Sequence, residues 1–158
     1  MVEELRFETS PEELPAFMQA LREQELAEQH GFSDACGVER EETIEIIYRF
    51  SLIARPLKIS VHTQVPKSKP SLPTLTDQYK GLLWAEREIA EMYGVTFVGH
   101  PDPRHLLLPD DWKGFPLRKD YVYPLDHPWL APDPLRDDPA KLLCPPEQLG
   151  EETDEDAI

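Results

Sequence analysis

The sequence predicts an α+β fold, in which an N-terminal helix packs on a small, mainly antiparallel sheet of three or four strands. A second helix and a long extended C-terminal arm follow. Three observations lead to this prediction. Two segments have helical periodicity, β-branched and aromatic segments lie between them, and eleven of the 17 prolines fall between Pro101 and Pro146. The 158 residues are enough for one domain with a hydrophobic core.

The first helix is expected to begin at Ser10. Ser10 suits the cap, Pro11 suits the first helical position, and Glu13 stands three residues after the cap. The apolar side chains that follow at helical spacing are Leu14, Phe17, Met18 and Leu21. Gly31 is expected to stop this helix.

Strands are expected at residues 32–38, 43–53 and 57–65, the last two being rich in β-branched and aromatic residues. Arg55 and Pro56 fit a hairpin turn, so the last two strands should pair antiparallel, with the first helix on their apolar face. The apolar face of the 43–53 strand consists of Ile44, Ile46, Tyr48 and Phe50.

A breaker-rich linker is expected at residues 66–73. Thr74 or Thr76 can then cap a second helix that runs to about Tyr93, with Gly94 at its C-terminus. Beyond Gly94 the periodicity fades, while the apolar and aromatic content stays too high for a disordered segment.

The last third of the chain is therefore expected to wrap on the surface of another protein. This divides the chain into a globular α+β domain (1–94), a motif-bearing extended segment (95–124) and a Pro-rich, acidic C-terminal tail (125–158). The acidic run at 151–156 fits a solvated, solubilising tail.

The composition excludes several classes of function. A formal net charge of −15 argues against nucleic acid or anionic lipid as the main partner. No apolar run reaches the ~20 residues that span a bilayer, and the acidic start lacks the features of a signal peptide, which predicts a soluble, cytoplasmic chain. Cys36 and Cys144 are expected to be free thiols, and two thiols are too few for an iron–sulfur cluster.

Two residues of the second helix break its amphipathic pattern. Glu86 falls within the apolar stripe, where a carboxylate needs a partner, so we expect it to accept hydrogen bonds from Arg104 or Arg118. The alternative is that Glu86 is solvated. Trp84 falls on the opposite, polar face, which it shares with Arg87 and Glu91. An exposed Trp84 would be an interface anchor, unless the N-terminal sheet covers it.

His100, Asp102 and His105 could suggest a metal site, but the prolines between them exclude helical ligand spacing and no fourth ligand is evident. His100 is instead expected to donate a hydrogen bond to backbone in a tight turn. Asp110 and Asp111 are adjacent, which suits a turn better than an acid–base pair. No nucleophile–base arrangement, phosphate-binding loop or dinucleotide motif occurs, so catalysis by this chain alone is not expected.

An ordered series of motifs runs from Trp84 to Pro124. Its parts are Glu86-Arg87-Glu88, Met92-Tyr93-Gly94-Val95, Phe97, Gly99-His100-Pro101, and Gly114 with Pro116-Leu117-Arg118-Lys119-Asp120. This series resembles the signature of the C subunits of the proton-pumping NADH-quinone oxidoreductases (respiratory complex I). Glu91 stands where that family usually has Asp, and Pro103 and His105 replace a Leu and an Arg, as in a divergent member.

The resemblance implies a non-catalytic scaffold subunit in the hydrophilic arm, peripheral to the cytoplasmic side of the cell membrane. Its implied partners are the quinone-module subunit related to hydrogenase large subunits and that subunit's small iron–sulfur neighbour, held in register. The complex would carry iron–sulfur clusters and quinone and, where NADH is the donor, FMN. This chain would bind none of them. The basic island Arg118, Lys119 and Asp120 is expected to dock on a neighbouring subunit rather than form a local surface ion pair.

Two other functions remain open. The same scaffold role could belong to a membrane-bound hydrogenase or formate hydrogenlyase, which carry a homologous subunit. A stand-alone metal hydrolase using His100, Asp102 and His105 is the second. Nickel in the purified complex would favour the first, and stoichiometric zinc or iron in the isolated chain would favour the second.

Overall fold

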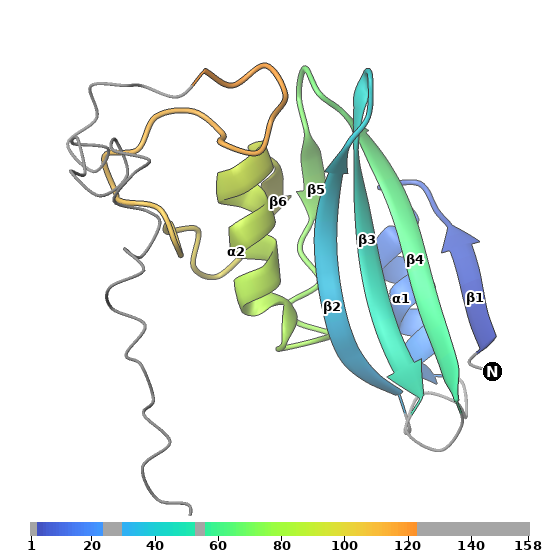
Figure 1. Ribbon diagram of the computed structural model, residues 1–158. Helices are drawn as coiled ribbons and strands as arrows, with labels where there is room; N and C mark the ends of the chain where they lie inside the picture. Colours follow the sequence, from blue (N-terminus) through green and yellow to red (C-terminus); the bar gives the residue numbers. More distant parts are fainter. Residues whose placement is uncertain (1–2, 24–29, 53–55, 123–158) are drawn as a thin grey trace, which may run out of the picture. The chain divides into compact units, whose positions relative to one another are not determined.

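The computed structural model describes residues 3–23, 30–52 and 56–122, which form two helices and six strands (Figure 1). In chain order the elements are β1 (Glu3–Glu8), α1 (Leu14–Glu23), β2 (His30–Glu39), β3 (Thr43–Leu52), β4 (Leu57–Pro66), β5 (Ser71–Pro73), α2 (Leu82–Tyr93) and β6 (Thr96–Val98). The predicted α+β class is confirmed. Arg55, Cys144 and the predicted C-terminal tail lie outside the described residues.

The main sheet has the strand order β1-β4-β3-β2. Strand β3 pairs antiparallel with β4, as expected from the sequence, and also antiparallel with β2, whereas β1 pairs parallel with β4. The sequence does not predict β1. Its side chains alternate between Leu5 and Phe7 on one face and three charged residues on the other, Glu4, Arg6 and Glu8. The charged residues make this segment look like an irregular polar stretch in the sequence.

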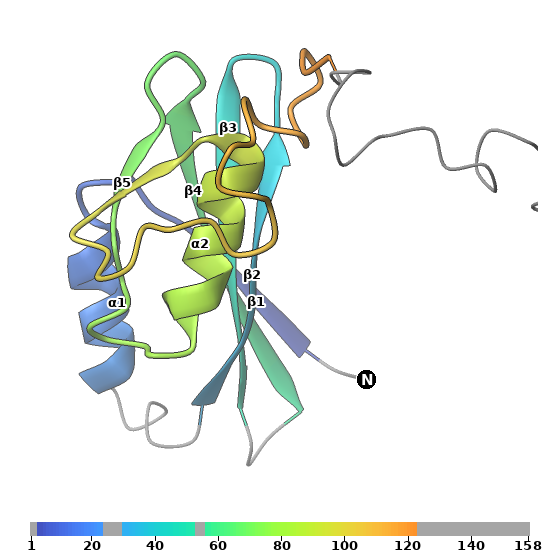
Figure 2. The same cartoon turned by 90° about the vertical axis from the view of Figure 1, so that its left-hand side faces the viewer.

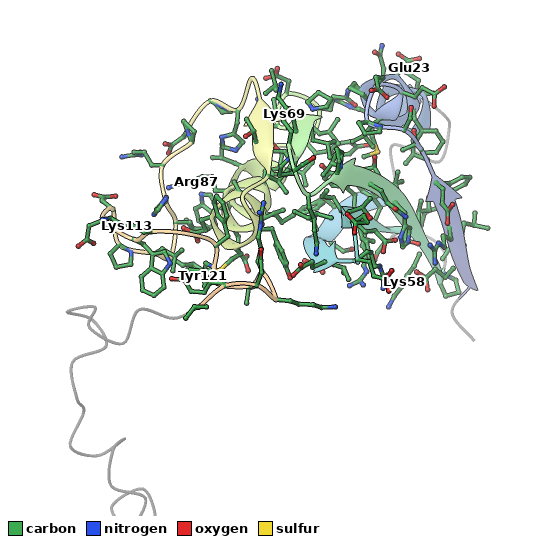
Figure 3. All side chains as sticks on the ribbon, turned by 90° about the horizontal axis from the view of Figure 1, so that it is seen from above. Glu23, Lys58, Lys69, Arg87, Lys113 and Tyr121 are labelled. Carbon is green, nitrogen blue, oxygen red and sulfur yellow. The ribbon has the colours of Figure 1, made fainter. Side chains whose placement is uncertain are left out.

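The hydrophobic core lies between the sheet and the two helices. Ile44, Ile46, Tyr48 and Phe50 are fully buried, which confirms the predicted apolar face of β3. Helix α1 contributes Leu14 and Met18, and α2 contributes Leu82 and Ile89, to the same cluster. Seen from above, side chains fill this space while the labelled charged residues Glu23, Lys58, Lys69 and Lys113 lie at the periphery (Figure 3).

Helix α1 is capped as predicted, but it is not stopped by Gly31. The Ser10 hydroxyl accepts a hydrogen bond from the Glu13 N–H (3.3 Å) and donates one to the Glu13 carboxylate (2.8 Å). Gly31 lies inside β2, opposite Ser51. The expected helix stop at Gly31 is therefore wrong.

Helix α2 begins later than expected. Gly81 occupies the cap position with no side-chain cap, so neither Thr74 nor Thr76 caps the helix. The predicted linker also contains β5. This strand pairs parallel with β6, which follows α2 in the sequence. Three-residue strands carry too little alternation to be read from sequence.

Gly94 ends α2 as predicted. Its φ of 73° is left-handed, and its N–H donates to the Ala90 carbonyl (2.8 Å). A Cβ at this position would lie 2.5 Å from the ring of Phe115. Glycine is therefore required here both for the backbone conformation and for the close approach of the following segment.

The segment after β6 wraps around α2 of the same chain, as Figure 2 shows by its yellow-to-orange path. The N–H of Leu117 donates to the Met92 carbonyl (3.2 Å), and the guanidinium of Arg118 donates to the Tyr93 carbonyl (2.7 Å). The surface that this part of the chain wraps is thus its own helix, where the sequence predicted another protein. Neither of the two helices in the described residues is long and apolar enough to cross a membrane.

Candidate functional site

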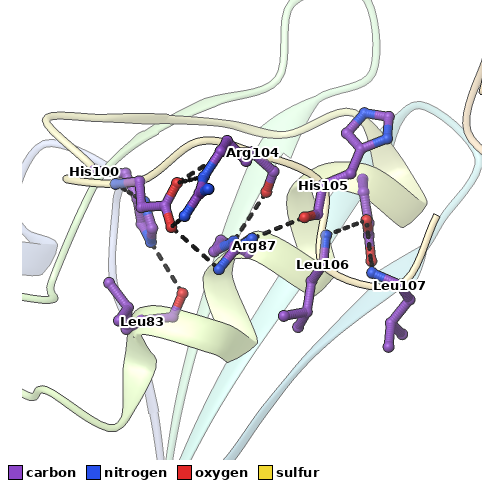
Figure 4. Close-up of polar contacts among 9 residues, drawn as sticks. Leu83, Arg87, His100, Arg104, His105, Leu106 and Leu107 are labelled. Carbon is purple, nitrogen blue, oxygen red and sulfur yellow. Dashed lines mark hydrogen bonds and ion pairs between the residues drawn. The ribbon is translucent and has the colours of Figure 1, made fainter. Parts of the chain in front are cut away.

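One face of α2 binds the loop at residues 104–108 through two charged side chains (Figure 4). Arg87 donates from Nε to the Arg104 carbonyl (2.9 Å) and from Nη2 to the His105 carbonyl (2.7 Å). One turn later, the carboxylate of Glu91 accepts hydrogen bonds of 2.8 to 3.3 Å from three successive backbone N–H groups, those of Leu106, Leu107 and Leu108. We call this pair the Arg87–Glu91 clamp.

The clamp matches the polarity of the loop backbone. Carbonyl oxygens face the cation, and three successive N–H groups face the anion, so each hydrogen bond is charge-assisted. Glu91 is only 5% exposed. Glu91 falls on the polar face of the helical wheel, and the loop covers it there. The signal in the sequence is an Arg and a Glu at i and i+4 on the face opposite the apolar stripe.

Asp102 joins the loop to the clamp. It accepts two hydrogen bonds from Arg104, at 2.7 and 2.9 Å, and pairs with Arg87 at 3.3 Å. The hydrogen bonds from Arg104 hold the pKa of the Asp102 carboxyl well below its usual range. Asp102 is therefore an anion under all ordinary conditions and fixes the side chain of Arg87 in place.

His100 uses both ring nitrogens within the chain. Nδ1 accepts from the Asp102 N–H (3.1 Å), so Nε2 carries the proton and donates to the Leu83 carbonyl in the first turn of α2 (3.1 Å). The expected hydrogen bond to backbone is confirmed. The described residues contain no group of three or more side chains that could hold a metal ion, and this bonding leaves no lone pair of His100 for one.

Glu86 is buried as predicted, with no exposed surface, but its predicted arginine partners are wrong. It accepts hydrogen bonds from the Thr74 hydroxyl (2.5 Å) and the Leu75 N–H (2.9 Å). Burial raises the pKa of Glu86 to about 7, although the two hydrogen bonds act in the opposite direction. Glu86 thereby ties the segment after β5 to the middle of α2.

The three residues of the basic island differ in burial, and Arg118 is half-buried. Arg118 lies 4.7 Å from the centre of the Phe115 ring and donates to the C-terminal end of α2. The Lys119 N–H donates to Glu39 (2.6 Å), which also pairs with Lys67. The side chains of Lys119 and Asp120 are exposed. The hydrogen bond from Lys67 lowers the pKa of Glu39, and that from Lys119 adds to it.

A charge cluster around the buried Glu45, on the other face of the sheet, was missed from the sequence. Glu45, on β3, is 2% exposed and accepts hydrogen bonds from Arg40 (2.5 and 2.8 Å) and from His62 on β4 (2.8 Å). Burial alone would raise the pKa of Glu45, but the hydrogen bonds from His62 and Arg40 outweigh it and lower the pKa. The only signal was a carboxylate within the apolar run of β3.

Several exposed apolar side chains come from α2, from β6 and from the segment that follows them. Trp84 is 66% exposed and Leu107 is 64% exposed. Among residues 3–23, 30–52 and 56–121, the exposed large hydrophobic side chains apart from Leu5 are Trp84, Val98, Leu107, Phe115 and Leu117. We call these five the α2 apolar surface. The sheet does not cover Trp84, which favours the interface-anchor interpretation.

Comparison with known proteins gives a consistent picture. The family described as respiratory-chain NADH dehydrogenase, 30 kDa subunit, matches residues 7–127. The C subunit of the NADH-quinone oxidoreductase of Roseiflexus castenholzii is 34% identical over 120 residues, covering 74% of this chain and 69% of that protein. The J subunit of the NAD(P)H-quinone oxidoreductase of Synechococcus sp. (strain CC9605) is 58% identical over 55 residues, which are 35% of this chain and 29% of that protein.

Two solved structures share the fold. The trypsin-resistant fragment (1–134) of Nqo5 superposes with a TM-score of 0.54 at 24% identity, over 63% of this chain and 82% of the fragment. A chain of the membrane-bound sulfane sulfur reductase, an archaeal respiratory membrane complex, superposes with a TM-score of 0.61 at 22% identity, over 69% of this chain and 65% of that chain.

Proposed function

Because the chain belongs to the family of the respiratory-chain NADH dehydrogenase 30 kDa subunit, we propose that it is a non-catalytic scaffold subunit of a proton-translocating NADH-quinone oxidoreductase. It would hold the quinone-module subunit and its small iron–sulfur neighbour in register. The observation that carries this proposal is the α2 apolar surface, which coincides with the motif-bearing part of the chain.

The α2 apolar surface has the properties of a docking site. A tryptophan that is 66% exposed is the kind of residue that dominates binding energy at interfaces, once it is desolvated in a partner's pocket. Burying a leucine side chain such as Leu107 contributes about 1.5–3 kcal/mol. Exposed clusters of this kind mark interaction sites on soluble proteins.

The contacts that hold these exposed side chains in place suit a rigid scaffold. The Arg87–Glu91 clamp fixes the loop that presents Leu107, and Arg118 fixes the segment that presents Phe115 and Leu117. Rigid presentation lowers the ordering cost of binding. Redox cofactors tolerate little displacement, so a subunit of this kind would support electron transfer without carrying it.

The redox groups would belong to neighbouring subunits. Two cysteines cannot supply the four thiolates of an iron–sulfur cluster, and the chain has no dinucleotide motif. Iron–sulfur clusters, quinone and flavin would therefore lie in the partners. The chain would be peripheral, on the cytoplasmic side of the membrane, and would reach the membrane only through those partners.

The test is assembly of a Trp84→Gln, Leu107→Gln variant. The tagged chain is recovered from membranes in mild detergent, and the co-purifying subunits are identified and quantified. We expect recovery of partners to fall at least about thirtyfold, the effect of losing one hot-spot residue, while the thermal midpoint of the isolated chain is unchanged. The matched control is Leu5→Gln, on β1. Full assembly of the double variant would refute the proposal.

A further inference from the structure

Strand β2 forms one edge of the main sheet and borders a hollow of about 180 Å³. Residues 34–37 of β2 line one side of the hollow. Ile89, Met92 and Tyr93 of α2 line the other, and Leu117 closes one end. In Figure 1, α2 runs alongside the outer edge of β2. The hollow therefore lies between a sheet edge and the helix that flanks it.

The backbone of this edge is available for pairing. Within the part of the chain that the structure describes, β2 pairs with β3 alone, and its backbone groups make no other backbone hydrogen bond. The register is interrupted between Phe32 and Asp34 and then runs regularly from Asp34 to Glu39. About half of the N–H and C=O groups in such a stretch point away from the neighbouring strand.

An added strand would fill the hollow. A strand adjacent to β2 would lie roughly 4.8 Å from it, and every second side chain would point toward α2. Met92 and Tyr93, which are half-buried, would contact these side chains, so the added side chains should be apolar. At Gly37 the Tyr93 ring packs directly against the strand, since a Cβ there would lie 2.7 Å from it.

The rim of the hollow is acidic. Glu88, on the exposed side of α2, makes no hydrogen bond or ion pair within the described residues, whereas Asp34 is already paired with Arg49 at 3.3 Å. The Glu88 carboxylate is thus free to bind a cation, and the chain as a whole carries a net charge of −15. Charge complementarity favours an occupant with a lysine or arginine at this point.

We propose that the β2 edge accepts an extended segment of another subunit as a fifth strand, with apolar side chains against Met92 and Tyr93 and a basic side chain beside Glu88. Backbone hydrogen bonds would supply affinity, and the alternate side chains would supply selectivity. This proposal rests on the proposed function, because the segment comes from a partner in the same complex. It does not involve Trp84 or Leu107, and of the α2 apolar surface only Leu117 borders the hollow.

Amide hydrogen exchange tests the proposal directly. Exchange is measured on the full-length free chain and on the same chain within the complex purified in mild detergent. We expect the amides within residues 34–37 that point away from β3 to exchange rapidly in the free chain and to become at least about tenfold slower in the complex. Amides of the central strand β3 should be protected in both samples and serve as the internal reference.

The outcomes separate the two proposals. Unchanged exchange at 34–37 in an assembled complex would overturn the added strand and leave the scaffold function standing. Failure of the chain to assemble with any subunit would overturn both. Protection of 34–37 already in the free chain, together with a dimeric mass in light scattering, would mean that a second copy occupies the edge, and would also overturn the proposal.

A charge reversal tests the chemistry of the occupant. Glu88→Lys should weaken assembly by roughly tenfold, since like charges would then meet at the edge, and should leave the thermal midpoint of the free chain unchanged. Glu12→Lys, which changes another exposed carboxylate, before α1, is the matched control. Equal assembly of the two variants would contradict a basic side chain at this point.

Discussion

Glu91 accepts hydrogen bonds from three successive backbone N–H groups, and Glu86 accepts from Thr74 and the N–H of Leu75. Both glutamates lie on α2, and both bind segments that have no regular structure of their own. A backbone group that loses its partner when buried costs about 1–3 kcal/mol. These two side chains therefore contribute to holding the chain on either side of α2.

Replacement of Glu91 by Gln should destabilise the isolated chain by about 1–3 kcal/mol. The glutamine amide would turn a donor toward the N–H groups of residues 106–108, and the charge that strengthens the bonds would be lost. Urea unfolding measures the loss, and faster amide exchange at 106–108 should accompany it. Glu88→Gln, on the same helix but unpaired within the described residues, is the control, and equal stabilities of the two variants would contradict the clamp.

The stability contributed by Glu86 should depend on pH. Its pKa is raised from 4.5 to about 7 in the folded protein, so between these values the folded chain binds a proton that the unfolded chain releases. The free energy of unfolding due to Glu86 is therefore greatest below about pH 4.5 and declines by up to about 3 kcal/mol as the pH rises through about 7.

The variant Glu86→Gln isolates this effect. Wild type should exceed the variant in stability by more at about pH 5 than at about pH 8, because only the wild-type carboxyl titrates in this range. Glu39 and Glu45, whose pKa values are lowered, act in the opposite direction but are present in both proteins and cancel in the difference. A difference that is constant with pH would contradict the account.

At the scale of elements, α2 organises the fold by binding β5 and β6 beside it and the 99–121 segment around it. Its last carbonyls accept hydrogen bonds from Leu117 and Arg118, which places a cation at the negative end of the helix. The helix therefore ends in contact with the segment that Gly94 allows to turn back. Arg118 acts here as an internal brace as well as part of the basic island.

Arg118→Gln should lower the stability of the isolated chain by about 1–2 kcal/mol, since it removes a charged hydrogen bond and the contact with the Phe115 ring. The measurement is the thermal midpoint. Lys119→Gln is the control, because the hydrogen bond from Lys119 to Glu39 comes from its backbone. If the midpoint is unchanged and assembly alone suffers, Arg118 serves the interface and not the fold.

The longer elements could be predicted from the sequence, and the shorter ones could not. The apolar face of β3 and the cap of α1 are local patterns, and both are confirmed. Strand β1 was hidden by its charges, and β5 and β6 exist only because they pair with each other. The prediction for Gly31 was wrong because an extended backbone is as accessible to glycine as a helix end.

The candidate site, like the fold, could be predicted from the sequence only in part. Burial of Glu86 and exposure of Trp84 followed from helical periodicity. Partners could not be predicted, because Glu91 binds N–H groups 15 to 17 residues further along a loop that contains several prolines. Arg104, expected near Glu86, is instead held by Asp102 two residues away, since a short-range ion pair needs no fold to form.

At the scale of the whole molecule, charged side chains around α2 make contacts within the chain, whereas large apolar side chains near them are exposed. The side chains of Arg87, Glu91 and Arg118 bind backbone groups of the same chain. The side chains of Trp84 and Leu107 are instead exposed to solvent. A scaffold needs both properties. The central claim is that other subunits cover the α2 apolar surface in the assembled complex.

Hydroxyl-radical footprinting of the tagged chain, free and within the complex purified in mild detergent, measures this coverage directly. We predict that oxidation of Trp84 and Leu107 falls severalfold in the complex, while that of Leu5 on β1 does not change. Equal oxidation of Trp84 and Leu107 in the two samples, or recovery of the chain with no other subunit, would contradict the claim.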